Sequence, residues 1–356
     1  MPGIGGTRWP SMPEPELSAS LIFSRTPLAE LVGLARRLED AGYHRVCFGE
    51  AWREPVVPMT ATLAATSRIG VGSAISQIYP VNPVVTAQQA AQLQELGAGR
   101  FTLGLGLGAG FVVERWFGVP YERPLRRTRE FIEVVRGVLG SAEHGPFSYE
   151  GEIFRVRKYR LPFAEQAVGV PIHLAAIGPR MQELAGELAD GIIVGSLHSP
   201  RSMEETKRRI DIGADRADRD PNEVALWYYL TCCVSNDSER ARALARRSLV
   251  YLTQYPHYRC VYAEEGFGAL AERIAGLARE RAMERAEAAI TDEMIDRFCI
   301  AGTVAECRDQ LRRYAGYPGS PVLHLVPFRI EEDEVVESFR LAAQLAQAPA
   351  GARATT

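Results

Sequence analysis

The stretch RIGVGSAISQIYPVNPVVTAQQAAQLQELGAGRFTLGLGLGAG, residues 68–110, decides the fold. Its β-branched start, 68–75, predicts a strand, and Asn82 and Pro83 mark the start of a helix that ends at glycine. A second strand follows over 101–107. Two strands joined through a helix run parallel with a right-handed crossover, so this stretch predicts one βαβ unit of a parallel sheet.

The second strand has bulky residues on one face and almost bare backbone on the other. Ligands bind at the C-terminal ends of strands in parallel α/β folds, where bare backbone lets a flat ring approach. Glycine also makes room for bulky neighbours across a narrow barrel, and the strand alone does not decide between these interpretations. The bulky face carries Phe101, Leu103, Leu105 and Leu107, and the bare face Thr102, Gly104, Gly106 and Gly108.

Composition and charge argue against several functional classes. The chain has 356 residues, 46% of them hydrophobic and 24% charged, which suits a large globular core. A net charge of −3 implies no general attraction to nucleic acid or to an anionic membrane, and no apolar run could span a bilayer. The 6 histidines lack metal-ligand spacing and the 6 cysteines form no C-x-x-C pair. We therefore predict no metal site and a reduced, cytoplasmic protein.

Strand and helix patterns alternate along the chain. Eight strand–helix repeats, over more than the ~250 residues typical of the fold, predict an α/β protein with a (βα)8 TIM barrel. A doubly wound open sheet is the alternative, but no G-x-G-x-x-G follows the first strand. Strands are expected at 17–24, 44–49, 68–75, 101–107, 170–176, 191–195, 224–234 and 321–327. Helices are expected at 27–42, 59–66, 82–96, 126–139, 179–189, 200–218, 238–252, 303–314 and 334–347.

The chain is expected to form a single barrel domain, residues 17–347, between loose tails at 1–16 and 348–356. The first of three insertions is expected to be a long loop. The second contains FSYEGEIFRV, 147–156, whose central turn predicts a hairpin. The third fits no repeat and is expected to be partly helical around 270–289. The insertions lie at about 109–121, 141–163 and 254–297.

The end of the fifth strand has the features of an anion site. Pro179, after Gly178, is favoured at the first position of a helix, which leaves the amides of Arg180 and Met181 at the positive end of the helix dipole. Arg180 adds a full charge, and Ser196 on the neighbouring strand end adds a hydroxyl. We predict a phosphate site here, because barrels often bind phosphate on late strands and a helix start. The alternative is an ordinary turn with a solvated arginine.

Glu50 and Trp52 follow the second strand. A carboxylate at a strand end could act as a general acid or base, or as a hydrogen-bonding anchor. It could equally form a salt bridge with Arg53 or with another base at the top of the barrel. Both interpretations stay open at this point.

Seven blocks in order resemble the bacterial luciferase-like monooxygenase family. The resemblance is strongest to the branch that uses the deazaflavin coenzyme F-420, which includes methylenetetrahydromethanopterin reductase. The order of the blocks is a specific signal, whereas each block alone is weak. The blocks are LARRLEDAGYHRVCFGE (34–50), RIGVGSAI (68–75), NPVVTAQQAAQLQELGAGRFTLGLGLG (82–108), RTREFIEVVRGVL (127–139), FSYEGEIF (147–154), VPIHLAAIGPRMQELAGELADGIIVG (170–195) and GTVAECRDQL (302–311).

This resemblance implies a (βα)8 barrel, a homodimer and a flavin-type ring at the strand ends. In the family, a bulge after the third strand carries a non-prolyl cis peptide that backs the ring, and the corresponding position here is Ala74–Ile75. The block AAIGPRM, 175–181, resembles the turn that holds the coenzyme phosphate in the deazaflavin branch. Members that bind flavin mononucleotide (FMN) tend to place a polar pair after this strand, which is absent here.

Three departures limit what the resemblance implies. Ala51 stands where the family often has histidine after the acidic residue of the second strand. Ala109 replaces the glutamate of some sugar-phosphate-oxidising members, and Val81 and Asn82 replace an Arg-His pair. Sugar-phosphate oxidation is therefore not expected, and the proton donor is not identified.

The resemblance predicts an oxidoreductase that transfers a hydride between coenzyme F-420 and a small organic substrate, with the protein binding and orienting both. Glu50 and Trp52 are expected on the reacting side of the ring as catalytic residues. The alternatives are an FMN-dependent monooxygenase that consumes oxygen and a barrel that binds flavin without turnover. The predicted coenzyme-binding residues are Ala74, Ile75, Gly106, Gly108, Gly178, Pro179, Arg180, Met181, Gly195 and Ser196.

Overall fold

The computed structural model describes residues 16–163, 169–314, 317, 319–325 and 328–346. The two expected tails lie outside these residues except for Glu16, as do the last two residues of the expected eighth strand. Among the helices of the described ranges, none combines the length and the apolar character needed to traverse a bilayer.

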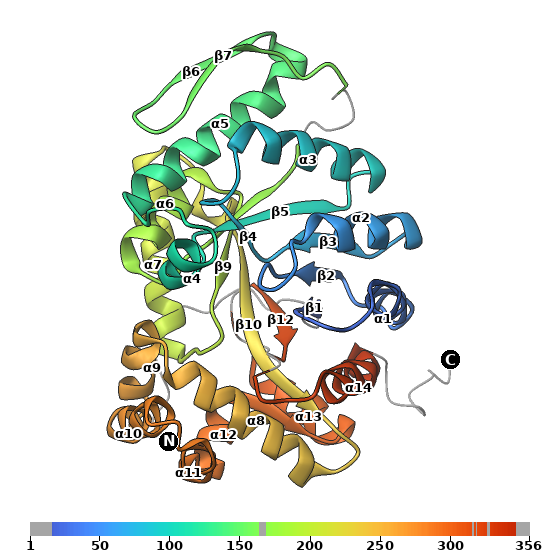
Figure 1. The fold of residues 1–356 in the computed structure, drawn as a ribbon, viewed down its shortest axis with the longest axis vertical. Helices are drawn as coiled ribbons and strands as arrows, with labels where there is room; N and C mark the ends of the chain where they lie inside the picture. The colour runs from blue at the N-terminus through green and yellow to red at the C-terminus, as the bar shows by residue number, and fades with distance from the viewer. Residues whose placement is uncertain (1–15, 164–168, 315–316, 318, 326–327, 347–356) are drawn as a thin grey trace.

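Eight parallel strands close into a barrel, which confirms the predicted TIM barrel and excludes the open sheet (Figure 1). Each strand pairs with the next, and the last returns to the first through the register Ser18–Val322. Closure leaves no free edge in the barrel wall. The barrel strands are β1 (Ser18–Leu21), β2 (Arg45–Phe48), β3 (Gly70–Ser73), β5 (Phe101–Gly106), β8 (Ile172–Ala175), β9 (Gly191–Val194), β10 (Ala225–Val234) and β12 (Ser320–His324).

The predicted helices surround this barrel. Four of them begin with proline at the first position, where its missing N–H is not needed. The Asn82 side chain also accepts the Val84 amide at the start of α3. The helices are α1 (Leu28–Asp40), α2 (Val56–Ala65), α3 (Pro83–Leu96), α5 (Pro124–His144), α6 (Pro179–Leu188), α7 (Pro200–Arg216), α8 (Ser238–Thr253), α13 (Val304–Leu311) and α14 (Glu332–Ala342).

Three short elements were not expected from the sequence. The two-residue strand β4 (Ser76–Gln77) pairs with the end of β5, and α4 (Gly110–Arg115) lies in the segment predicted as a loop. The strand β11 (Cys299–Gly302) pairs with the far end of β10, which is long enough to extend beyond the barrel. Each element is too short for a periodic pattern, so its contacts with neighbouring strands decide its structure.

The second insertion forms the predicted hairpin, made of β6 (Phe147–Glu150) and β7 (Arg155–Tyr159). It packs on α5, where the Glu130 carboxylate accepts the backbone N–H groups of Glu152, Ile153 and Phe154 at 3.0, 2.9 and 3.0 Å. The third insertion is more helical than expected. It contains η2 (Pro256–Tyr258), α9 (Arg259–Glu264), α10 (Gly268–Arg279), α11 (Met283–Ala289) and α12 (Asp292–Phe298).

Side chains fill the barrel interior from one end. Nearest the N-terminal end of the strands, the Arg45 guanidinium lies 4.3 Å from the ring centre of Trp227, and the His173 ring lies 4.1 Å from the same ring. Two positions further along its strand, Tyr229 reaches the opposite wall. The N-terminal end is therefore closed by stacked rings, which leaves the C-terminal end for a ligand, as in other barrels of this type.

Candidate active site

A bulge separates β3 from β4, and it carries the predicted cis peptide bond between Ala74 and Ile75. The two sides of the bulge are held by the neighbouring strand β2. The Ala74 amide donates to the Phe48 carbonyl at 2.9 Å, and the Ile75 carbonyl accepts from the Glu50 amide at 3.0 Å. The bulge therefore lies directly beside the end of β2, where the predicted catalytic residues begin.

Tyr229 supports this bulge from the other side of the barrel. Its phenol donates to the Ala74 carbonyl at 3.0 Å and lies 3.1 Å from the Ser20 hydroxyl. Burial raises the pKa of Tyr229, so the phenol keeps its proton and remains a donor at neutral pH. Sequence reasoning did not single out Tyr229. The alternation in β10, which places Trp227 and Tyr229 on one face, was the available signal.

The glycines of β5 make room for the bulge. A Cβ atom at Gly106 would lie 2.2 Å from the Ile75 side chain, and one at Gly108 would lie 2.0 Å from Gln77 Oε1. Gly108 also has a φ of +72°, which favours glycine. The glycine face of β5 was interpreted either as room for a ligand ring or as room for neighbouring residues. The structure shows neighbouring residues, Ile75 and Gln77, against it. A ring would accordingly meet Ile75 rather than the backbone of β5.

Glu50 is half-buried and lies next to Gln77. Its carboxylate accepts the Gln77 backbone N–H at 2.7 Å. Burial raises the pKa of Glu50, the Gln77 amide partly offsets this effect, and the charge of Glu54 raises the pKa further. Gln77 stood at a predicted strand end, but its role in holding Glu50 was not anticipated.

The alternative salt bridge between Glu50 and Arg53 is not formed. Arg53 instead donates to the backbone carbonyls of Thr26 and Ser24 at 2.6 and 3.2 Å. In the described part of the chain Glu50 takes part in no ion pair. Trp52 is 55% exposed and lies at the surface near this end of the barrel. The carboxylate of Glu50 is thus left without a compensating cation.

The turn that begins α6 is open to solvent. Residues 177–180 are all exposed, and no atom lies within 4 Å of the position that a Cβ of Gly178 would take. The amides of Gly178 and Arg180 have no hydrogen-bond partner among the described residues. The Met181 amide was predicted to be free, and this prediction is wrong, because the amide donates to the Gly178 carbonyl at 3.0 Å. One of the two amides predicted to be free is therefore occupied within the turn.

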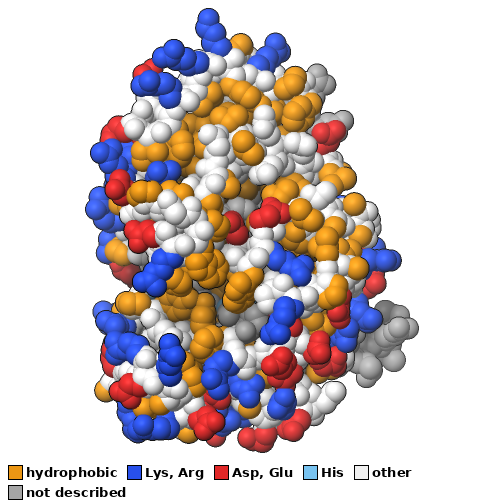
Figure 2. All heavy atoms as spheres, in the orientation of Figure 1, with side chains coloured by type: hydrophobic (Ala, Val, Ile, Leu, Met, Phe, Trp, Pro, Cys, Tyr) orange, Lys and Arg blue, Asp and Glu red, His pale blue; other side chains and the backbone are white. Residues whose placement is uncertain are grey.

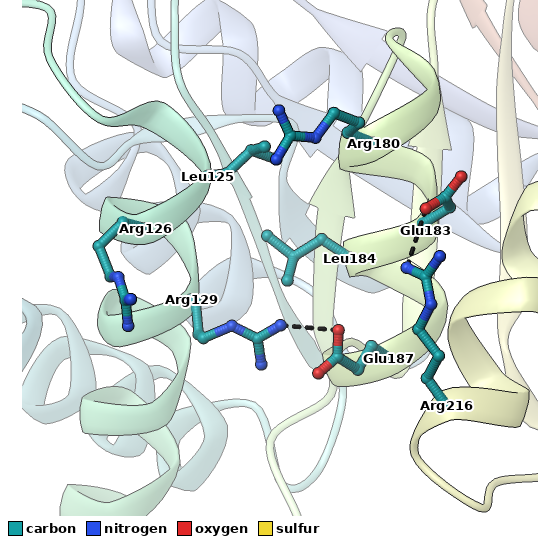
Figure 3. A pocket seen from close by; sticks show the side chains of 8 residues that line it. All are labelled: Leu125, Arg126, Arg129, Arg180, Glu183, Leu184, Glu187 and Arg216. Carbon is teal, nitrogen blue, oxygen red and sulfur yellow. Dashed lines mark hydrogen bonds and ion pairs between the residues drawn. The ribbon is translucent and has the colours of Figure 1, made fainter.

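Arg180 lines a groove of about 350 Å³ between α5 and α6, shown in Figure 3. The acidic residues of this groove already have partners: Glu187 lies 2.7 Å from Arg129, and Glu183 lies 2.9 Å from Arg216. Figure 3 shows Arg180 reaching toward Leu125, away from these carboxylates. No ion pair of Arg180 occurs among the residues that the structure describes, so its charge is available to an anion at the turn.

The end of β9 has a neighbour that sequence reasoning missed. Tyr258, from η2, accepts the backbone N–H of Ser196 at 2.8 Å. A Cβ atom at Gly195 would lie 2.2 Å from the Tyr258 hydroxyl oxygen. The space beside Gly195, which was predicted as a coenzyme-binding residue, therefore holds the phenol of Tyr258. The third insertion has no regular pattern, so no sequence signal identified Tyr258.

The turn and Ser196 nevertheless follow neighbouring strands. Ala175 of β8 is paired with Ile193 of β9. Gly178 lies three residues after Ala175 and Ser196 three residues after Ile193, so both residues follow their strands at the same level of the sheet. Figure 2 shows a hollow near the centre of one face, at the position of β4 in Figure 1, with acidic side chains at its edge and hydrophobic ones around it. Because the barrel strands are parallel, the predicted ring and phosphate residues follow strands that end on the same side of the barrel.

Comparison with known proteins agrees with this architecture. The family model described as luciferase-like monooxygenase matches residues 10–319. The 5,10-methylenetetrahydromethanopterin reductase of Archaeoglobus fulgidus is 29% identical over 280 residues, which cover 77% of this chain and 82% of that protein.

Solved structures give the same result for the fold. The coenzyme F-420-dependent tetrahydromethanopterin reductase of Methanopyrus kandleri superposes with a TM-score of 0.78 at 22% identity, over 93% of this chain and 98% of that chain. The oxygenating constituent of 3,6-diketocamphane monooxygenase from Pseudomonas putida, solved with FMN, has a TM-score of 0.65 at 13% identity, over 92% and 97% of the two chains. Because the family model covers most of its length, the chain belongs to the luciferase-like monooxygenase family.

Proposed function

We propose that the protein is an oxidoreductase that transfers a hydride between coenzyme F-420 and a small organic substrate. The observation that carries the proposal is the exposed turn at Gly178–Arg180, which has two amides and one arginine without partners. An anionic coenzyme satisfies all three groups at once. The name of the Archaeoglobus relative and that of the Methanopyrus structure support this coenzyme.

The residues present fit a phosphate at the turn. Gly178 leaves open space, Pro179 starts the helix, and Arg180 is free of carboxylates. Met181 follows with its amide already engaged, so it contributes to the turn rather than to the anion. Each charge-assisted hydrogen bond to the phosphate would contribute about 1.5–3 kcal/mol. We assign a further contact to the Ser196 hydroxyl on the neighbouring strand end.

The ring platform is assigned to Ala74 and Ile75, with Gly106 and Gly108 providing the room that these residues need. Tyr229 holds this platform through its bond to the Ala74 carbonyl. When bound, the deazaflavin ring supplies a carbon that gives or accepts a hydride. The protein then has to orient the ring against the substrate and to exclude competing reactions.

Glu50 and Trp52 are assigned to the reacting side. Glu50 lies beside the bulge, and burial holds its pKa above the usual range of a carboxyl. A carboxyl of this kind keeps its proton to higher pH and suits proton transfer to or from a substrate oxygen or nitrogen. Trp52 offers an exposed apolar surface near the entrance.

An FMN-dependent monooxygenase is the second candidate, because the Pseudomonas structure of the same fold contains FMN. A barrel that binds flavin without turnover is the third. The homodimer implied by the family resemblance stays a prediction, which light scattering of the purified protein checks.

Titration of the apo protein with coenzyme F-420 and with FMN, followed by ring fluorescence, tests the proposal. We expect tight binding of coenzyme F-420, a large loss of affinity in Gly178→Leu and a smaller loss in Ser196→Ala. Gly33→Leu is the control, because Gly33 also has no atom within 4 Å of its Cβ position but lies in α1. Tight binding of FMN alone, with oxygen consumption, would favour the monooxygenase, and binding of neither would disprove the phosphate site.

A further inference from the structure

Two buried polar side chains lie next to each other on the seventh and eighth strands of the barrel. Thr231 and His324 are the last matched pair of β10 and β12, and neighbouring strands lie about 4.8 Å apart. Thr231 is 1% exposed and His324 is 3% exposed. Thr231 Oγ1 and His324 Nε2 have no hydrogen-bond partner among the described residues. Buried polar atoms are normally paired, so two such atoms side by side indicate a missing partner.

Both side chains point into the barrel. The His324 ring lies 5.0 Å from the ring of Tyr229 in an edge-to-face arrangement. Tyr229 in turn donates to the Ala74 carbonyl of the bulge at 3.0 Å. Alternation along β10 places Thr231 on the same face as Trp227 and Tyr229. Because Trp227 lies at the closed end of the barrel, Thr231 lies further toward the C-terminal end, where the ligand is expected.

The order of the strands separates this pair from the proposed coenzyme residues. Going round the barrel, those residues follow four consecutive strands, β3, β5, β8 and β9. The other four, β10, β12, β1 and β2, are also consecutive. Glu50 follows β2 and His324 ends β12, so both lie on this second arc. A substrate beside the ring would occupy the arc that the coenzyme leaves free, which puts Thr231 and His324 on the substrate side.

Neither side chain of the pair is charged at neutral pH. Burial, with a smaller effect of neighbouring His198, lowers the pKa of His324 to about 3. A neutral imidazole carries one N–H, and a threonine hydroxyl both donates and accepts. The pair therefore suits an uncharged carbonyl or hydroxyl oxygen, because a buried phosphate or carboxylate needs a compensating charge.

We propose that Thr231 and His324 bind an uncharged carbonyl or hydroxyl oxygen of the substrate, an inference that rests on the function proposed above. His324 donates to this oxygen through Nε2, and Thr231 donates through its hydroxyl. The pair thereby selects substrates with a neutral oxygen and disfavours those that place a phosphate or a carboxylate here. Neither residue stood out in the sequence, because the register of β10 and β12 brings them together.

Three small probes of the same shape test the proposal: acetone, isobutene and acetate. They carry, respectively, an uncharged oxygen, no oxygen and a charged carboxylate. Each probe is added to the coenzyme-loaded protein, whose histidine ring nitrogens are followed by NMR; the chain has 6 histidines, so substitutions assign the signals. We expect acetone to shift the Nε2 signal of His324, and isobutene and acetate to leave it in place. No shift with acetone would mean that the pair binds only water, and equal shifts with isobutene would mean that no hydrogen bond forms; either result would overturn the proposal.

Substitutions that keep the shape of each side chain provide a second measurement. Acetone affinity is obtained from the probe's own methyl signal, so it can be measured in every variant. His324→Phe and Thr231→Val should each weaken acetone binding by about twofold to tenfold and leave coenzyme affinity unchanged. His324→Gln should recover part of the loss, because its amide N–H lies near the position of Nε2. Loss of coenzyme affinity along with acetone affinity would indicate a role in packing and contradict the proposal.

His173→Phe and Thr62→Val are the matched controls. His173 Nδ1 and Thr62 Oγ1 are also buried and without a hydrogen-bond partner in the described part of the chain. His173 lies beside Trp227 at the closed end of the barrel, and Thr62 lies in α2. Both controls should leave acetone affinity unchanged. A loss in the controls equal to that in His324→Phe would show a general effect on the core and overturn the proposal.

The probes need no turnover, so this inference and the proposed function can fail separately. If the protein binds FMN in place of coenzyme F-420, the same probes are added to the FMN-loaded protein. A shift of His324 with acetone would then support the substrate pair, although the proposed coenzyme would be wrong. Tight binding of coenzyme F-420 without any shift of His324 would overturn only the substrate pair, and binding of neither coenzyme would overturn both.

Discussion

At the scale of single residues, Glu50 is the side chain whose surroundings fit proton transfer best. It accepts the Gln77 amide at 2.7 Å and has no cation beside it in the described part of the chain. We expect Glu50→Gln to lower turnover by about a hundredfold, because the variant keeps a hydrogen-bond acceptor and loses the proton. Coenzyme affinity should change little. Steady-state kinetics and a coenzyme titration measure the two effects.

Glu54→Gln is the matched control for that experiment. Glu54 is a nearby carboxylate, but it accepts the backbone amides of Val56 and Val57 at the start of α2. Its loss should lower turnover far less than the loss of Glu50, because Glu54 acts on Glu50 only through its charge. If Glu50→Gln changes neither turnover nor affinity, Glu50 has only a structural role.

The raised pKa of Glu50 also predicts how stability depends on pH. Burial raises the folded-state pKa above the usual 4.5, so folding favours the protonated carboxyl. This contribution is fully present below pH 4.5 and is lost as the pH rises through the folded-state pKa. Glu50→Gln should therefore raise the melting temperature at pH 8, and the gain should disappear near pH 4. A gain that grows as the pH falls would contradict the sign of the shift.

At the scale of elements, the hairpin β6–β7 depends on one glycine of α5. A Cβ atom at Gly137 would lie 2.0 Å from the ring of Phe147, whereas one at Gly140 has only His144 nearby, at 3.5 Å. Alanine normally stabilises a helix by up to about 1 kcal/mol relative to glycine. We expect this gain in Gly140→Ala and a net loss of about 1–3 kcal/mol in Gly137→Ala, because Phe147 must move.

Thermal unfolding and hydrogen exchange of residues 147–159 measure that difference. Faster exchange of the hairpin in Gly137→Ala, and not in Gly140→Ala, is the expected result. Equal stability of the two variants would show that the hairpin adjusts freely on α5.

At the scale of the whole molecule, one carboxylate joins the first and the last strand–helix units of the barrel. Glu332, at the start of α14, accepts the backbone amides of Ser24, Arg25 and Thr26 after β1 at 2.8, 2.8 and 2.6 Å. Burial alone would raise the pKa of Glu332, but these bonds and those from the two hydroxyls lower it to about 2. The contribution to stability is thus present above pH 4.5 and is lost as the pH falls toward 2.

Glu332→Gln should lower the free energy of unfolding at pH 7 by about 1–2 kcal/mol, a value that allows for partial exposure to solvent. The difference from wild type should shrink as the pH falls from 4.5 toward 2. Glu331→Gln is the control, because the Glu331 side chain makes no capping hydrogen bond. Denaturant unfolding at several pH values provides the measurement, and a difference independent of pH would contradict the assignment.

The sequence alone was enough to predict the elements of the barrel, and the place of the site stays a prediction from the same patterns. Alternating patterns and proline at helix starts are local features, so they predicted strands such as 101–107 and helices such as α6. The ordered family blocks identified the bulge at Ala74–Ile75 and the turn at 178–181. These predictions succeeded for the elements because periodicity and capping act over a few neighbouring residues.

Which side chains meet depends on tertiary contacts that no local pattern encodes. Tyr229 reaches Ala74 across the barrel, Tyr258 reaches Ser196 from the third insertion, and Arg53 turns away from Glu50. A periodic pattern tells which face a residue occupies but not which distant residue lies opposite, because closure of the barrel sets that pairing. The same reason explains why the bare face of β5 proved to hold the Ile75 side chain: the neighbour was 31 residues away from Gly106 in sequence, and only the folded chain brings the two together.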